Sequence, residues 1–131
     1  MVEENFPEAF QALKLAKKAN DLNAILSATY WLGGMQALHC EFKEAEHNLK
    51  ECIEVNQAAN ILWGISSLKS LISYSVYYHE GSIKKGFATS LDAVKFSDES
   101  QNAYSKAMAY VTHGVLYYCK GSLMTRQKNI F

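Results

Sequence analysis

The sequence repeats itself with a period of about 40 residues. One repeat position, with separations of 41 and 40 residues, holds Gly33, Tyr74 and Gly114. A second position, nine residues later, holds Phe42, Ile83 and Leu123. Small residues match at Ala45 and Gly86, and the pair Phe6 and Ala9 precedes the pair Phe42 and Ala45 by 36 residues. A period of roughly 20–50 residues is typical of chains that stack short structural units into an array.

The residues between these positions favour helix. The only proline is Pro7, and the first turn of a helix tolerates proline well. The other segments are rich in Ala, Leu, Lys, Glu and Gln, and the alternating pattern of strands is scarce. We therefore predict an all-α fold of about six helices, over residues 7–19, 22–39, 43–58, 61–79, 83–96 and 101–119.

Polar residues and glycines mark the expected helix ends. Asp21 is the predicted N-cap of the second helix. Candidate N-caps of the later helices are Asn60, Ser82 and Ser100. Gly81 and Gly121 each follow a predicted helix, where a left-handed turn favours glycine.

Small residues in the repeat indicate where helices cross. Two helices joined by a tight turn approach closely only where a side chain is small, and Gly33 and Ala45 supply this on facing helices. Phe42 and Ile83 can fill the wedge at the turn. Each hairpin then leaves an apolar flank that a neighbouring hairpin must cover, so we expect stacked antiparallel hairpins.

This pattern resembles the tetratricopeptide repeat. Leu32-Gly33 matches the leucine and small residue of the family's helix A. The family's turn and the small residue of its helix B are matched by Gly81-Ser82-Ile83, Gly121-Ser122-Leu123, Ala45 and Gly86. The period is longer than the family's, which is about 34 residues, and the proline that ends helix B is absent. Repeats of this length look like those of MalT-like and ATPase- or kinase-linked bacterial regulators. The resemblance implies a right-handed superhelix.

The same alignment assigns the helices to the family's A and B positions. Residues 7–19 correspond to a helix B. Residues 22–58 and residues 61–96 each correspond to an A–B pair, and residues 101–119 correspond to a helix A. Terminal repeats need polar caps. A single repeat domain over residues 1–131, cut from a longer array, is therefore the expected organisation, and a self-contained six-helix protein is the alternative.

Composition argues against several partners. The chain has 13 Lys and Arg residues against 13 Asp and Glu, with Arg126 as the only arginine, so it lacks the basic stripe that nucleic acid or an acidic membrane requires. The longest uncharged stretch, residues 22–40, contains polar side chains that are costly in lipid. Three widely spaced cysteines and a polar N-terminus indicate reduced thiols and a cytoplasmic location.

Enzyme motifs are missing from the sequence. It contains no phosphate-binding glycine loop and no dinucleotide-binding fingerprint. It also contains no zinc-protease helix motif and no nucleophile elbow. His39, Cys40 and His47 are too loosely spaced for a zinc site. We therefore predict a non-enzyme with no metal and no cofactor.

The resemblance also locates a candidate binding surface, because helix A lines the concave groove of tetratricopeptide arrays. The matching positions predict a partner-binding groove of Tyr30, Gly34, Leu68, Leu71, Ser75, Tyr78, Met108, Val111, Val115 and Tyr118. The structural alternative is that the tyrosines pack between repeats, with their hydroxyls reaching water or a carbonyl.

The expected function is non-catalytic. A groove of this composition would hold an apolar or amphipathic helix, from a protein or peptide partner, from an adjacent region of the parent protein or from a second copy. This predicts a module for protein–protein interaction or regulatory sensing within a larger cytosolic signalling or transcription regulator. One alternative is a small-molecule sensor with a pocket between the tyrosine-rich helices. Another is a helical enzyme or metal protein, which would need a cluster of ionisable groups.

Overall fold

A computed structural model describes the backbone of residues 5–130 and the side chains of residues 5–122. This part of the chain consists of helices and turns without any strand, which confirms the predicted all-α fold. The helices are α2 (Pro7–Ala19), α3 (Leu22–Leu38), α4 (Phe42–Ala58), α5 (Leu62–Leu71), the π-helix η1 (Ile72–Tyr78), α6 (Ile83–Ser100) and α7 (Ala103–Ile130).

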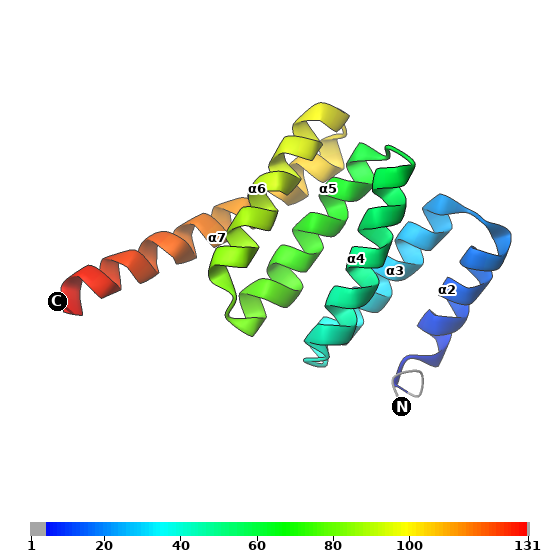
Figure 1. The fold of residues 1–131 in the computed structure, drawn as a ribbon, viewed down its shortest axis with the longest axis horizontal. Helices are drawn as coiled ribbons and strands as arrows, with labels where there is room; N and C mark the ends of the chain where they lie inside the picture. The colour runs from blue at the N-terminus through cyan, green and yellow to red at the C-terminus, as the bar shows by residue number, and fades with distance from the viewer. Residues whose placement is uncertain (1–4, 131) are drawn as a thin grey trace.

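Helices that follow one another in the chain pack side by side. Helices α2 and α7 lie at opposite ends of the row, and the C-terminal turns of α7 project beyond the other helices (Figure 1). In the same view α3 lies behind α4, and α7 lies behind α6. Helix α5 also contacts α3 and α7, so these three helices form one layer. The centre of the core lies between α3, α4, α5 and η1.

The turns show the repeat in the backbone. The turns that follow α2, α4 and α6 each contain one residue in the left-handed backbone conformation. These residues are Asn20, Asn60 and Gln101, with φ of 52°, 54° and 55°. The turns after α3 and η1 contain Cys40 and Gly81, with φ of 61° and 89°. Hydrogen bonds repeat as well, because the Asn20 N–H donates to the Lys17 carbonyl and the Asn60 N–H to the Gln57 carbonyl, each at 3.1 Å.

Small residues permit close helix packing at two of the repeat positions. A Cβ added to Gly33 would lie 2.7 Å from Leu49 of α4. A Cβ added to Gly86 of α6 would lie 2.9 Å from Leu116 of α7. Gly114, which matches Gly33 in the sequence, has no neighbour within 4 Å of its added Cβ. The repeat therefore has tight crossings inside the array and an open position on its last helix.

Several predicted helix ends are wrong. Helix α6 continues to Ser100 rather than ending at residue 96, and α7 begins at Ala103 and continues to Ile130 rather than ending at 119. Gly121 lies inside α7, so the turn predicted there is not formed. Glycine lowers helix stability by only about 1 kcal/mol, which a long helix tolerates.

The capping predictions have mixed outcomes. Asp21 accepts hydrogen bonds from the N–H groups of Asn23 at 3.0 Å and Ala24 at 3.1 Å, which confirms it as the N-cap of α3. Asn60 lies in a left-handed turn instead. The cap before α7 is Asn102 rather than Ser100, because the Asn102 side chain accepts from the Ser105 N–H at 2.9 Å. Ser82 precedes α6 without a side-chain cap bond.

Candidate functional site

Large apolar side chains are exposed along α3, η1 and α7. We call six of them the apolar strip, namely Trp31, Leu38, Tyr74, Tyr104, Val111 and Tyr118; Leu22, Tyr110 and Tyr117 are also exposed on these helices but are not counted in the strip. Leu38 is 83% exposed, Tyr118 76% and Trp31 69%. Large apolar side chains with this exposure on neighbouring helices mark an interaction surface more often than isolated ones do.

Helical spacing aligns the strip residues of α7. Tyr104, Val111 and Tyr118 follow one another at intervals of seven residues. Seven residues are close to two helical turns, so the three side chains lie on one face of α7. The half-buried Met108 and Val115 occupy intermediate positions beside this face. Helix α7 therefore presents a continuous apolar edge.

Tyr30 connects the strip across α5. The pKa of Tyr30 is raised to about 12 by burial, with further contributions from the charge and hydrogen bonding of Tyr104. Tyr30 belongs to α3 and Tyr104 to α7, and α5 contacts both helices. The Tyr30 ring also lies edge-on to Trp31, with ring centroids 6.2 Å apart. Since η1 also contacts both α3 and α7, the exposed residues of these three helices lie on neighbouring elements.

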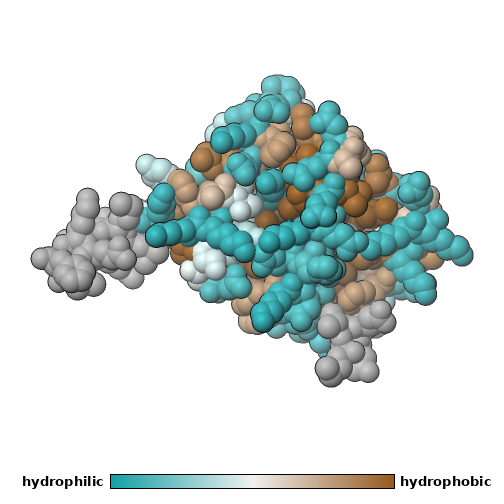
Figure 2. Space-filling view, viewed as in Figure 1, coloured by the Kyte–Doolittle hydropathy of each residue, from teal (hydrophilic) through white to brown (hydrophobic). Residues whose placement is uncertain are grey.

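Charge is distributed unevenly over the molecule. Helix α3 and η1 contain no Asp, Glu, Lys or Arg, whereas α4 and α6 carry many. In Figure 2, hydrophilic side chains form a band across the face on which α4 and α6 lie in front of α3 and α7. Ion pairs occur on these charged helices, such as the one between Lys85 of α6 and Glu46 of α4 at 2.8 Å. The apolar strip lies on α3 and η1, which carry no charge, and on α7, which carries Lys106, Lys120, Arg126 and Lys128 but no acidic residue.

A pocket of about 440 Å³ opens at one end of the strip, where α3 ends, α4 begins and η1 passes. It is lined by Ala37, Leu38, Cys40, Phe42, Tyr74, Ser75 and His79. None of these lining residues is Asp, Glu, Lys or Arg. Ligand pockets commonly have volumes of about 300–1,000 Å³ and mostly apolar walls, so this pocket has the dimensions of a binding site.

The π-helix η1 shapes one wall of this pocket. Tyr74 and Tyr78 stack with ring centroids 5.3 Å apart and an angle of 8° between the rings, and His79 stands edge-on to both. The His79 Nδ1 lies 2.8 Å from the Tyr74 carbonyl oxygen. A carbonyl only accepts, so Nδ1 carries the proton and donates. Wider π turns occur frequently at functional sites.

The groove residues predicted from the sequence fall into different environments. Val111 and Tyr118 are exposed members of the strip, and Ser75 lines the pocket. Leu68 is fully buried in the core, so it cannot contact a partner at the surface. Partly buried positions are occupied by Tyr30, Gly34, Leu71, Tyr78, Met108 and Val115. Sequence reasoning missed four strip residues, Trp31, Leu38, Tyr74 and Tyr104, although Trp31 and Leu38 are seven residues apart like the strip residues of α7.

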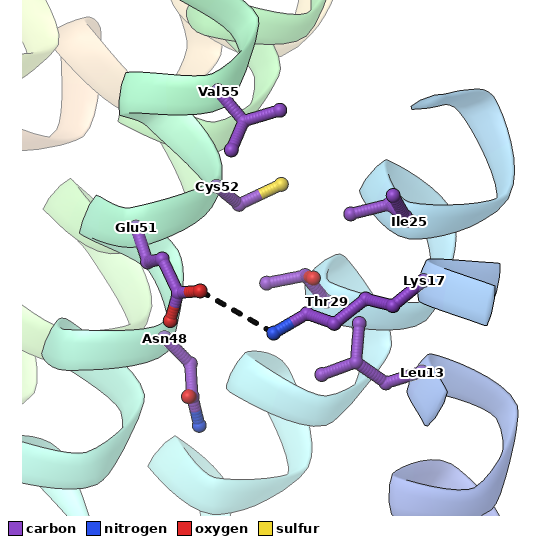
Figure 3. Close-up of a pocket in the computed structure, with 8 residues that line it drawn as sticks. All are labelled: Leu13, Lys17, Ile25, Thr29, Asn48, Glu51, Cys52 and Val55. Atoms are coloured by element: carbon purple, nitrogen blue, oxygen red, sulfur yellow. Dashed lines mark hydrogen bonds and ion pairs between the residues drawn. The ribbon is translucent and has the colours of Figure 1, made fainter. Parts of the chain in front are cut away.

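A second cavity, between α2, α3 and α4, has a volume of about 20 Å³ (Figure 3). The ion pair between Lys17 and Glu51, at 3.3 Å, crosses it, and the Cys52 thiol lies inside. Burial raises the pKa of this thiol. The cavity is large enough for about one water molecule, so it is a packing defect, lined by both apolar and polar side chains.

Neither a metal-binding cluster nor a membrane-spanning helix is found among the described residues. Within residues 5–122, no three His, Cys, Asp or Glu residues are grouped in a way that could hold a metal ion. None of the described helices combines the length and the apolar composition that crossing a bilayer requires.

Comparison with protein-family models, curated proteins and solved structures gives no match to this chain. The apolar strip and its pocket are therefore the features of the molecule that bear on its function.

Proposed function

We propose that this chain is a non-catalytic helical-repeat module that binds a helical segment of another protein through the apolar strip. The observation that carries the proposal is the exposure of Trp31, Leu38, Val111 and Tyr118 on neighbouring helices, of which α3 has no charged residue. The proposal includes a tetratricopeptide-like superhelix within a larger cytoplasmic regulator. The recurring left-handed turns support the repeat, and the resemblance in sequence supports the family and its setting.

The chemistry of the strip specifies the partner. A charged segment would lose hydration against α3 without finding a counter-charge there, so the contacting face must be apolar. An amphipathic helix presents such a face and keeps its polar side in water. The spacing of seven residues between Tyr104, Val111 and Tyr118 suits side chains that recur at helical intervals on the partner. A separate protein segment, a neighbouring region of the parent chain and a second copy could all supply such a helix.

The proposal is tested by selecting displayed peptides of about 20 residues, long enough for a helix of about 30 Å, against the native chain. Selected segments are titrated against the native chain and against Leu38→Glu. Leu15→Glu is the matched control, because Leu15 is 56% exposed on α2, away from the strip. We expect Leu38→Glu to weaken binding at least about tenfold, while Leu15→Glu changes it less than about twofold. Equal affinities for the two variants would contradict binding through the strip.

The pocket favours a second candidate function, that of a small-molecule sensor. Its volume of about 440 Å³ and its uncharged lining suit a small apolar compound. A small ligand would raise the melting temperature by mass action without changing the solution mass beyond one ligand. A protein segment would increase the mass measurably, so light scattering combined with thermal melts separates the two functions.

A further inference from the structure

We infer that the pocket lined by Leu38, Phe42, Tyr74, Ser75 and His79 is an anchor site for one tyrosine or tryptophan side chain of the bound segment. The inference rests on the proposed function and identifies the chemistry of the group that enters the pocket. Its basis is the combination of apolar walls, the absence of charge in the lining and one fixed hydrogen-bond acceptor.

The walls favour a flat apolar group. Phe42 and Tyr74 contribute aromatic rings, and Leu38 adds an aliphatic side chain that is 83% exposed in the absence of a partner. Aromatic rings pack well against one another edge-to-face or in offset stacks. Because no Asp, Glu, Lys or Arg lines the pocket, a lysine entering it would lose hydration without gaining an ion pair.

His79 supplies the acceptor. Its Nδ1 proton is donated to the Tyr74 carbonyl at 2.8 Å, which leaves Nε2 of the neutral ring as an acceptor. The edge-on contacts with Tyr74 and Tyr78, at centroid distances of 5.1 Å, hold the ring in place. A phenol O–H or an indole N–H can donate to Nε2, whereas a phenylalanine ring would cover this nitrogen and leave it unpaired.

Ser75 adds a second polar group. Its neighbours Ser67, Ser70 and Ser73 each donate to a carbonyl four residues earlier, at 2.9, 2.9 and 2.6 Å. Among the described side chains, the Ser75 hydroxyl makes no such bond, and it lines the pocket. It can accept from or donate to the hydroxyl of an entering tyrosine. Together the two polar groups favour an aromatic ring with one donor over a plain hydrocarbon ring.

The test uses side-chain analogues on the full chain, followed by amide chemical shifts. The probes are p-cresol for tyrosine, 3-methylindole for tryptophan and toluene, which has no donor, for phenylalanine. We expect p-cresol and 3-methylindole to bind at least about fivefold more tightly than toluene, with the largest shifts at Ala37, Ser75 and His79. Equal affinities, or shifts centred outside the pocket, would overturn the inference.

A histidine substitution separates the acceptor from the shape of the pocket. His79→Phe keeps a ring but removes Nε2, so it should reduce the preference for p-cresol to what the Ser75 hydroxyl alone supports, without weakening the binding of toluene. His47→Phe is the matched control, because His47 is an exposed histidine of α4 that does not line the pocket. A preference for p-cresol that is undiminished in His79→Phe would show that His79 is not the acceptor, and the inference would fail.

The selected peptides distinguish this inference from the proposed function. We expect them to carry one tyrosine or tryptophan whose change to phenylalanine weakens binding to the native chain more than binding to His79→Phe. If peptides bind the strip without such a residue, the anchor inference fails and the proposed function stands. If the analogues enter the pocket but no peptide binds the chain, the pocket belongs to a free aromatic compound, and both the anchor role and the proposed function fail.

Discussion

The Tyr77 hydroxyl of η1 donates a hydrogen bond to the Glu46 carboxylate of α4 at 3.0 Å. Lys85 of α6 contacts the same oxygen at 2.8 Å, and Lys50 does so at 2.6 Å. Burial alone would raise the pKa of Glu46, but these hydrogen bonds outweigh it and lower the pKa to about 2. One carboxylate thereby joins three helices at the edge of the core.

The first prediction concerns acid stability. Because the pKa of Glu46 is lower in the folded chain than in the unfolded one, the carboxylate stabilises the fold fully above about pH 4.5, and this contribution is lost as the pH falls towards 2. Glu46→Gln should lower the free energy of unfolding at pH 7 by about 1 kcal/mol, a modest value because solvent screens part of the ion pairs. The difference from the native chain should shrink between pH 4.5 and 2.

Urea denaturation of both chains across that pH range checks the prediction. Glu44→Gln is the control, because Glu44 is exposed on the same helix and makes none of the ion pairs found among the described residues. A Glu46→Gln chain that is as stable as the native one at pH 7 would contradict the structural role of this cluster.

The second prediction concerns the helix crossing at Gly33. A Cβ there would lie 2.7 Å from the fully buried Leu49, so Gly33→Ala forces α3 and α4 apart. We expect a loss of about 1–3 kcal/mol in the free energy of unfolding. Gly114→Ala is the matched control, because its Cβ meets nothing within 4 Å, and it should stabilise α7 by about 0.5–1 kcal/mol. Thermal and urea melts that give both changes the same sign would exclude the tight crossing.

The repeat and the cap at Asp21 were predictable because they depend on local chemistry. The exposed face of α3 was not, since this helix contains no charged residue and its apolar side chains surround it on all sides. The pattern of α3 therefore does not distinguish Leu38, which is exposed, from Leu32, which is buried. Leu68 is assigned to the groove only by the resemblance to the tetratricopeptide repeat, and the structure buries it in the core instead. The π-helix η1 was missed because no residue pattern signals a wider turn.

The third prediction tests the link between α3 and α7. Burial raises the pKa of Tyr30 to about 12, and Tyr104 contributes the next largest part of the shift. Tyr104→Phe should therefore lower the pKa of Tyr30, though not to its ordinary value. Alkaline titration followed by tyrosine ring carbon chemical shifts measures this directly. Tyr117→Phe, an exposed tyrosine on the same helix, should leave the pKa of Tyr30 unchanged. An unaltered Tyr30 titration in Tyr104→Phe would mean that α3 and α7 do not meet over α5 in solution.

The fourth prediction separates the apolar strip from the core with two neighbouring residues. Trp31 is 69% exposed and Leu32 is 0% exposed. Trp31→Ala should therefore change the free energy of unfolding by less than about 0.5 kcal/mol, whereas Leu32→Ala should lower it by about 2–5 kcal/mol. Urea melts measure both values, and they should be repeated over a range of protein concentrations.

If a second copy covers the strip, the cost of Trp31→Ala will grow with concentration, because self-association adds stability by mass action. A cost for Trp31→Ala that is large at every concentration would place Trp31 in the core and remove it from the binding surface.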